Sequence, residues 1–245
     1  MTFNRRLFEK QRKKYLEAIG KSNKLRVYSQ KFNEVATDLS YVYQWDWLGE
    51  PIIQSPSDMI VIQEKIFEVK PDIIIETGVA WGGSILFYAT ILDSINKGKV
   101  IGIDLNLDKK IFNKLKNKKF SKRIKLIKSN SLSKNIDKKL KNKFKKKKKI
   151  MVILDSNHTH EHVLDELNFY SRYVSKKSYI IVCDTILNFI GGKVKGRKRP
   201  WNSKKNPMTA VETFLKNNKN FIIDKDIEKK LFFSNNQSGY LKKIK

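Results

Sequence analysis

The stretch over residues 72–84, DIIIETGVAWGGS, constrains the fold more than any other part of the chain. Residues 73–75 are three isoleucines, a short β-branched run that is typical of a strand buried on both faces of a parallel sheet. The run stops at Glu76, and glycines follow that permit sharp bends and close approach to a ligand. From Ile85 the pattern ILFYATIL predicts a helix. The stretch therefore predicts a strand, a tight turn and a helix, the place where open α/β sheets bind ligands.

The glycine loop favours S-adenosylmethionine over NAD as its ligand. Gly78, Gly82 and Gly83 form G-x-x-x-G-G, whereas a dinucleotide fingerprint is G-x-G-x-x-G. Glu76 precedes the first glycine by two residues, where a carboxylate repels phosphate and attracts the cationic ammonium and sulfonium of S-adenosylmethionine. Ser84 is expected to cap the helix that follows. A buried turn without a ligand is the alternative for these residues.

Two further strands add candidates for the same cofactor. KVIGIDL ends in Asp104, about the right distance downstream for an acid that accepts hydrogen bonds from ribose hydroxyls. RIKLIKSN predicts the next strand, and after it the side chains of Asn130 and Ser131 are expected to hydrogen-bond an adenine edge. The predicted cofactor-binding set is therefore Glu76, Gly78, Gly82, Ser84, Asp104, Asn130 and Ser131.

Strand and helix patterns alternate five times along the chain, which predicts an α/β, doubly wound Rossmann-like sheet with helices on both faces. At 245 residues with 40% hydrophobic content, one large domain is expected. A single cysteine excludes an intramolecular disulfide framework. The N-terminus has no apolar signal core, and the most apolar window, 73–92, contains an acid and three glycines. We therefore expect a cytoplasmic protein without a transmembrane segment.

The formal net charge of +28 suggests an anionic partner, either nucleic acid or a membrane surface. Only eight of the 52 basic residues are arginine, the side chain that binds phosphates and bases bidentately, so specific nucleic-acid binding is not expected. The lysine run over 138–149 lies between two predicted strands, which favours a solvated crossover helix and loop. Nonspecific attraction of polyanions at low salt is expected instead.

The remaining segments flank this core. Residues 4–20 predict a basic amphipathic helix that packs on the main domain or on a partner subunit, which leaves a homo-oligomer open. We therefore expect a basic helical extension over 1–45 and the main domain over 46–245. The aromatic segment 40–56 is expected to be irregular, and 187–206 is long enough for a lid. Helices are expected over 57–70 and 207–215, and short strands in NFIID, LFFS and GYLKK.

All three histidines, His158, His160 and His162, fall in the stretch LDSNHTHEH. Their spacing does not match a metallo-β-lactamase-like site, which needs an aspartate between the second and third histidine and further histidines downstream. It does not match a site of two histidines and one carboxylate either, because that needs a well-separated histidine. Polar residues at a helix start are the alternative interpretation.

Placement at strand ends is more informative than the histidine count. Asp155 and Asp184 each end a predicted strand, on the edge where Glu76 and Asp104 also end theirs. Two carboxylates at this edge can hold Mg²⁺, which lowers the pKa of a bound hydroxyl. His158 follows Asp155 by three residues and is the expected general base. The sequence thus predicts Asp155 and Asp184 as metal ligands, and His158 with Asp155 as the catalytic pair.

Several motifs together resemble the cephalosporin hydroxylase / rhamnosyl O-methyltransferase family over roughly residues 43–243. They are ETGVAWGGS, LDSNHTHEHVLDEL, IIVCDT, RPW followed by NPMTAVETFL, and SGYLKK. The resemblance implies an S-adenosylmethionine-dependent methyltransferase fold. It also implies that Glu76, Gly78 and Asp104 bind the cofactor and that Asp155 and Asp184 hold Mg²⁺.

Two positions differ from what is known of similar enzymes. His158 stands where catechol-type O-methyltransferases, which are similar, carry a lysine base. Cys183 stands where family members often carry an acid, so the resemblance implies that one carboxylate is missing from the metal site. Thiols are poor ligands for Mg²⁺, so dependence on the metal is open.

The resulting expectation is an S-adenosylmethionine-dependent O-methyltransferase that acts on a hydroxyl of a sugar, glycolipid or related small metabolite, with assistance from Mg²⁺ left open. Its partner would be a small-molecule or glycan acceptor. The alternative is a nucleic-acid methyltransferase or polyanion-binding protein on the same fold, although no D/N-P-P-Y/F motif for base amines is present. A non-catalytic partner protein is the third interpretation.

Overall fold

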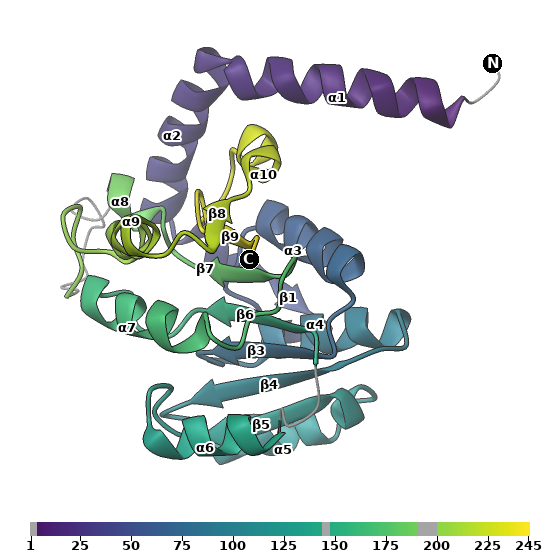
Figure 1. The fold of residues 1–245 in the computed structure, drawn as a ribbon, viewed down its shortest axis with the longest axis vertical. Helices are drawn as coiled ribbons and strands as arrows, with labels where there is room; N and C mark the ends of the chain where they lie inside the picture. The colour runs from purple at the N-terminus through teal and green to yellow at the C-terminus, as the bar shows by residue number, and fades with distance from the viewer. Residues whose placement is uncertain (1–3, 144–147, 191–199) are drawn as a thin grey trace.

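The computed structural model describes residues 4–143, 148–190 and 200–245, and its centre is a sheet of seven strands in the order β5-β4-β3-β6-β7-β9-β8 (Figure 1). The strands are β3 (Ile73–Thr77), β4 (Lys99–Asp104), β5 (Ile124–Lys128), β6 (Ile150–Leu154), β7 (Tyr179–Val182), β8 (Phe221–Ile223) and β9 (Tyr240–Lys243). Strands β3 to β7 run parallel, and β9 pairs antiparallel with both β7 and β8. The predicted α/β sheet is confirmed.

Side chains of the central strands alternate between two apolar clusters, one on each face of the sheet. In β3, Ile74 belongs to the first cluster, whereas Ile73 and Ile75 belong to the second. This alternation follows from the twofold period of a strand, and both faces are apolar because helices cover both. Burying one such side chain contributes about 1.5–3 kcal/mol, so β3 is a firmly held base for the glycine loop.

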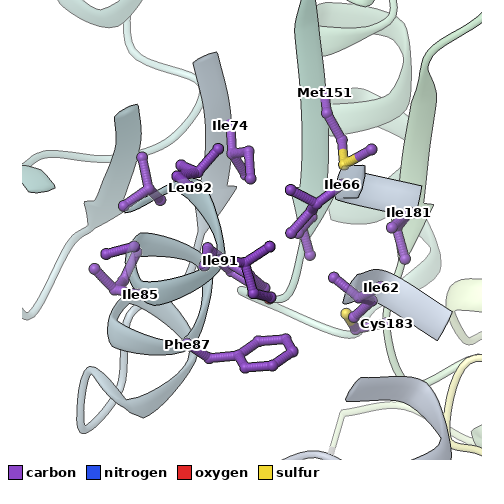
Figure 2. Close-up of a cluster of buried hydrophobic side chains, with 14 of the residues drawn as sticks. Ile62, Ile66, Ile74, Ile85, Phe87, Ile91, Leu92, Met151, Ile181 and Cys183 are labelled. Carbon is purple, nitrogen blue, oxygen red and sulfur yellow. The ribbon is translucent and has the colours of Figure 1, made fainter. Parts of the chain in front are cut away.

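Helices cover both faces of the sheet (Figure 1). Buried side chains of α3 (Pro56–Val69), α4 (Gly83–Ser94), α5 (Lys109–Lys116) and α10 (Lys225–Lys230) join the first cluster, part of which Figure 2 shows. Those of α6 (Lys134–Lys143), α7 (His160–Tyr170) and α9 (Pro207–Asn217) join the second. The predicted doubly wound arrangement is thus confirmed.

Two helices precede this body, α1 (Arg5–Lys21) and α2 (Asn23–Asp38). The first was predicted and the second was not. The break between them lies at Ser22, whose hydroxyl accepts a hydrogen bond from the Leu25 amide and caps α2. No residue of α1 is buried, and in Figure 1 the helix extends along the outer edge of the molecule beyond α10. No helix among the described residues has the length and apolar character needed to cross a bilayer.

The aromatic segment after α2 is mostly irregular, as expected. It contains the short 3₁₀ helix η1 (Tyr41–Gln44) and the hairpin of β1 (Asp46–Trp47) and β2 (Glu50–Pro51). The short helix α8 (Leu187–Ile190) begins the segment predicted as a lid. Residues 144–147 of the lysine run and 191–199 of the predicted lid lie outside the described residues.

The strand predicted for LFFS, residues 231–234, is wrong. This segment follows α10 as a loop, and the carbonyl of Phe232 accepts hydrogen bonds from the side chains of Ser29 and Asn33 in α2. Its backbone is thus satisfied by side chains from a distant helix instead of by a neighbouring strand.

Candidate functional site

The turn after β3 brings the glycine loop against the end of β6. Gly78 has φ +84°, in the left-handed region, and a Cβ atom at this position would overlap the carbonyl oxygen of Asp155. Only glycine avoids both the strain and the overlap. The close approach places the loop directly beside Asp155, so the predicted cofactor loop and the predicted metal ligand form one site.

Glu76 is fully buried at the end of β3 and is held by two hydroxyl groups. The Ser84 hydroxyl donates to Oε2 at 2.9 Å, and the Tyr88 hydroxyl donates to Oε1 at 3.0 Å. Burial, and then the charge of Asp155, raise the pKa of Glu76 well above its usual range. A positively charged ligand nearby would reduce the cost of ionising this buried group, so the carboxyl group is suited to such a ligand.

Ser84 therefore does not cap α4, which corrects the sequence expectation. The N-cap is Gly82, with φ +87°, and no side chain caps the helix. Ser84 lies in the first turn and binds Glu76 instead.

Asp104 at the end of β4 organises the glycine loop through backbone amides. Its Oδ2 accepts hydrogen bonds from Val79 at 2.8 Å and Ala80 at 3.3 Å, and its Oδ1 accepts one from Asn106 at 2.7 Å. An ionised carboxylate offers about four lone-pair sites, so it can accept further hydrogen bonds from ribose hydroxyls. The predicted ribose contact is compatible with this geometry and stays a prediction.

A hollow beside the loop is lined by Gly78, Val79, Trp81, Ser84 and Asp155, and also by Gln54 from the aromatic segment. Gln54 donates from Nε2 to the Tyr88 hydroxyl at 3.2 Å, while its buried Oε1 has no hydrogen-bond partner. A buried acceptor without a partner is costly, and the ammonium group of a ligand would satisfy it. Sequence reasoning missed Gln54, because nothing in its local pattern connects it with a loop 24 residues away.

Asn130 and Ser131 do not line this hollow. The Asn130 side chain accepts a hydrogen bond from the Leu132 amide at 2.8 Å. Ser131 is buried, and its carbonyl accepts a hydrogen bond from the Tyr170 hydroxyl at 2.6 Å. Both residues follow β5 as expected, and their contact with an adenine stays a prediction.

Asp155, His158 and Asp184 come together beyond the ends of β6 and β7. One ligand atom from each lies within 4.8 Å of the other two, and His158 Nε2 is 3.3 Å from Asp184 Oδ2. Two carboxylates and an imidazole at these separations are a donor set for a divalent cation. The structure brings the predicted pair of acids together and adds His158 as a third ligand candidate, a role that its sequence spacing had not suggested.

The electrostatics of this cluster also favour a cation. Burial, and then the neighbouring charge of Asp184, raise the pKa of Asp155 from 3.8 to about 7. Two acids this close repel each other when both are ionised, and a bound cation removes that repulsion. Asp155, His158 and Asp184 therefore fit a metal site better than they fit the alternative interpretation, polar residues at the start of a helix.

Asp184 is held in position by residues near the C-terminus. Its backbone amide donates to Asn236 Oδ1 at 3.0 Å, and Asn235 Nδ2 donates to Asp184 Oδ1 at 3.4 Å. Asp184 itself has φ +56°. Both asparagines lie about 50 residues further along the chain, so no local pattern in the sequence connects them with Asp184.

Cys183 lies outside the Asp155, His158 and Asp184 cluster. Its side chain is buried in the first apolar cluster, near Ile62 (Figure 2), and burial raises the pKa of its thiol well above the usual value. Three candidate ligands thus converge without a contribution from position 183.

The other two histidines have separate partners. His160 Nδ1 lies 2.7 Å from the Thr209 hydroxyl in α9. His162 Nε2 lies 3.3 Å from Oε1 of the buried Glu166, and a hydrogen bond to that carboxylate raises the pKa of His162. Of the three histidines, the cation cluster found among the described residues contains His158 alone.

Comparison with protein families gives a match to the model described as Rhamnosyl O-methyltransferase/CmcI, over residues 39–244. A Rhamnosyl O-methyltransferase from Mycobacterium leprae (strain TN) is 30% identical over 144 residues, which are 58% of this chain and 61% of that protein. The chain thus spans less than two thirds of the length of this relative.

Solved structures with a similar fold include cmcI with Mg and SAM, with a TM-score of 0.58 and 15% identity over 83% of this chain and 78% of that one. The O-methyltransferase TomG from Streptomyces achromogenes in complex with SAM has a TM-score of 0.50 and 14% identity, over 68% of this chain and 71% of that one. At these identities the similarity establishes the fold, which is that of the methyltransferases.

Proposed function

This chain belongs to the Rhamnosyl O-methyltransferase/CmcI family, and from that premise we propose that it is an S-adenosylmethionine-dependent O-methyltransferase acting on a hydroxyl of a sugar, glycolipid or related small metabolite. The observation that carries the proposal is the convergence of Asp155, His158 and Asp184 beside the glycine loop. The family and the mycobacterial relative are named for O-methylation of a rhamnosyl group, so a glycoside is the first acceptor to test.

Neither Glu76 nor Asp104 lines the hollow, but each is hydrogen-bonded to a residue that does, and together with Gln54 they fit the cofactor. Glu76 and the unpartnered Oε1 of Gln54 are proposed to bind the ammonium group, and Asp104 to accept hydrogen bonds from the ribose. Gly78 and Gly82 give the loop its shape, whereas Asn130 and Ser131 are proposed to contact the adenine. When bound, S-adenosylmethionine supplies an electrophilic methyl group, and Mg²⁺ supplies a Lewis acid that acidifies the acceptor hydroxyl.

Asp155 and Asp184 are proposed to hold the cation, and His158 to accept the hydroxyl proton as general base. The nitrogen that faces Asp184 is Nε2, and one nitrogen cannot bind a cation and accept a proton at the same time. Replacing His158 with alanine separates these roles. If His158 is a base, the variant loses turnover but keeps its Mg²⁺ affinity. If His158 is a metal ligand, the variant loses Mg²⁺ affinity as well.

Calorimetry with S-adenosylmethionine tests the cofactor site before any acceptor is known. We expect micromolar affinity, about −8 kcal/mol, and a loss of about tenfold or more in Asp104→Ala. Asp46→Ala, which removes an exposed carboxylate from β1, is the matched control and should bind normally. Binding of NADH without binding of S-adenosylmethionine would contradict the proposal.

The acceptor class is tested by methyl transfer to rhamnosides, other glycosides and nucleic acids. We expect transfer to a glycoside and only weak, salt-sensitive binding of a random DNA duplex. Nanomolar, sequence-dependent binding near physiological salt would instead favour nucleic-acid methylation, which the family match does not support.

We also propose that residues 46–245 form the methyltransferase unit and that residues 1–45 are an extension of it. The family match begins at residue 39, and α1 contributes no buried residue to the body.

A further inference from the structure

Exposed apolar side chains are concentrated in the N-terminal helices. In the part of the chain that the structure describes, 21 large hydrophobic residues are exposed, and 12 of them lie between Leu7 and Tyr43. Single exposed apolar residues are ordinary on a protein surface, but a contiguous group marks an interaction site.

On α1 these residues share one face. Leu7, Phe8, Tyr15 and Ile19 recur at helical spacing, and their exposed fractions are 53%, 60%, 64% and 36%. We call them the α1 apolar face. Each would contribute about 1.5–3 kcal/mol if it were buried, so leaving all four in water forgoes a substantial stabilisation.

The contacts of α1 with the body come from Glu17 and Gly20, which lie away from the apolar face, and from Arg12, which lies beside it at helical spacing. Gly20 packs against the Lys229 side chain of α10, and Glu17 forms an ion pair with Lys229 at 2.5 Å. Arg12 lies 3.8 Å from Glu64 of α3. The four apolar side chains are exposed and α1 runs along the outer edge of the molecule (Figure 1), so a flat surface can reach them.

The net charge of α1 distinguishes between the surfaces that could cover its apolar face. The helix carries seven lysines and arginines and two glutamates, a net charge of +5. A second copy of a chain with a net charge of +28 would bring like charge against it, whereas an anionic lipid surface is complementary. A helix of 17 residues with nine charged side chains cannot cross a bilayer, but an apolar face beside a lysine- and arginine-rich face is typical of helices that lie in the interface.

We propose that α1 binds the surface of an anionic membrane, with its apolar face inserted at the headgroup boundary and its basic side chains against the lipid phosphates. Binding of this kind depends on buried apolar area as well as on charge. This requirement separates the proposal from the general attraction that a basic chain has for any polyanion.

Co-sedimentation of the full chain with vesicles tests the proposal without cofactor or acceptor. We expect binding to vesicles of phosphatidylcholine with phosphatidylglycerol, and much weaker binding to pure phosphatidylcholine. Replacing Leu7 and Phe8 with serine leaves the charge unchanged and should weaken binding at least about tenfold. The matched control replaces Ile60 and Phe67, which are exposed on α3 at 61% and 56%, with serine, and should bind like the wild type.

A second pair of substitutions tests the charge. Lys13→Gln and Lys14→Gln should each weaken binding to the anionic vesicles by about fivefold. Circular dichroism of all variants checks that they remain folded.

Three outcomes would overturn the proposal. The first is failure of the wild type to sediment with anionic vesicles. The second is equal binding by the wild type and the variant with serine at positions 7 and 8, which would mean that charge alone accounts for binding. The third is a lipid-free dimer that this variant converts to a monomer, because a second copy of the chain would then cover the face.

Discussion

At the carboxyl edge of the sheet, acidic groups are enclosed by apolar structure, with Glu76 fully buried and Asp155 half-buried. In α1 the arrangement is reversed, because leucine, phenylalanine and tyrosine are exposed among lysines and arginines. The edge depends on the folded core to hold its charges in place, whereas α1 contributes nothing to that core. Equivalent substitutions in the two regions should therefore have very different effects on stability and catalysis.

The largest difference is expected in catalysis. Loss of a general base costs about 10²–10⁴ in rate, so His158→Ala should reduce methyl transfer to a glycoside by that factor. Asp155→Asn should also reduce it and should abolish stimulation by Mg²⁺. The variant with serine in place of Leu7 and Phe8 should transfer methyl groups at the wild-type rate in the absence of lipid. Full activity of both His158→Ala and Asp155→Asn would remove the proposed mechanism.

Stability gives the next contrast. Gly78→Ala introduces a Cβ that overlaps the Asp155 carbonyl and also strains the backbone, so the free energy of unfolding should fall by at least about 3 kcal/mol. Gly49 has a similar φ of +78° but open space around its Cβ position. Gly49→Ala should therefore show only the backbone strain, about 1–2 kcal/mol. Denaturant unfolding measures both, and equal losses would mean that the contact with Asp155 is unimportant.

A tyrosine in each region permits the same chemical change. Tyr88→Phe removes a donor to the buried Glu76 and should lower the free energy of unfolding by about 1–3 kcal/mol. Tyr15 on α1 is 64% exposed, so Tyr15→Phe should change it by no more than about 0.5 kcal/mol. A similar loss in both variants would mean that α1 is part of the cooperative fold after all.

The pH dependence of cation binding is a further test of the acidic edge. The pKa of Asp155 is raised to about 7, so a proton competes with the cation below that pH. Affinity for Mg²⁺ should rise about tenfold per pH unit up to about pH 7 and then level off. Calorimetry between pH 5.5 and 8.5 measures this, and a flat profile would contradict it.

The same pKa predicts an opposite trend for stability without metal. Because the pKa of Asp155 is higher in the folded state, its protonated form increases the free energy of unfolding, and this contribution is complete below the ordinary pKa of 3.8. This contribution is lost as the pH rises through about 7, and the loss should be absent in Asp155→Asn.

The sequence was sufficient to predict the elements whose pattern of apolar residues matches the faces that they bury. The isoleucines of β3 form an uninterrupted apolar run because helices cover both faces, and the acids at the strand ends meet because parallel strands end on one edge. The helix α2 was missed although its apolar residues recur at steps of three and four, at Leu25, Tyr28, Phe32 and Val35, and then at Leu39 directly after it. This signal was available in the sequence, and exposure of these side chains does not alter it.

What the sequence could not supply depends on contacts between distant residues. The side chains of Ser29 and Asn33 satisfy the Phe232 carbonyl, which removes the need for a strand at 231–234. Asn235 reaches Asp184 from about 50 residues away. A serine that caps a helix and a serine that binds a buried acid cannot be distinguished by sequence, and only the fold brings Ser84 against Glu76.

The close approach of Gly78 to Asp155 links the two ligands of the proposed enzyme thermodynamically. The loop that is proposed to bind the cofactor touches the backbone of Asp155, which is proposed to hold the cation. A shift of the loop therefore moves Asp155, and a shift of Asp155 moves the loop. If cofactor binding improves the position of Asp155, each ligand must raise the affinity for the other by the same factor. Titrating Mg²⁺ with and without saturating S-adenosylmethionine, and then the reverse, would measure that reciprocal factor twice, and a factor of one would show that the two sites are independent.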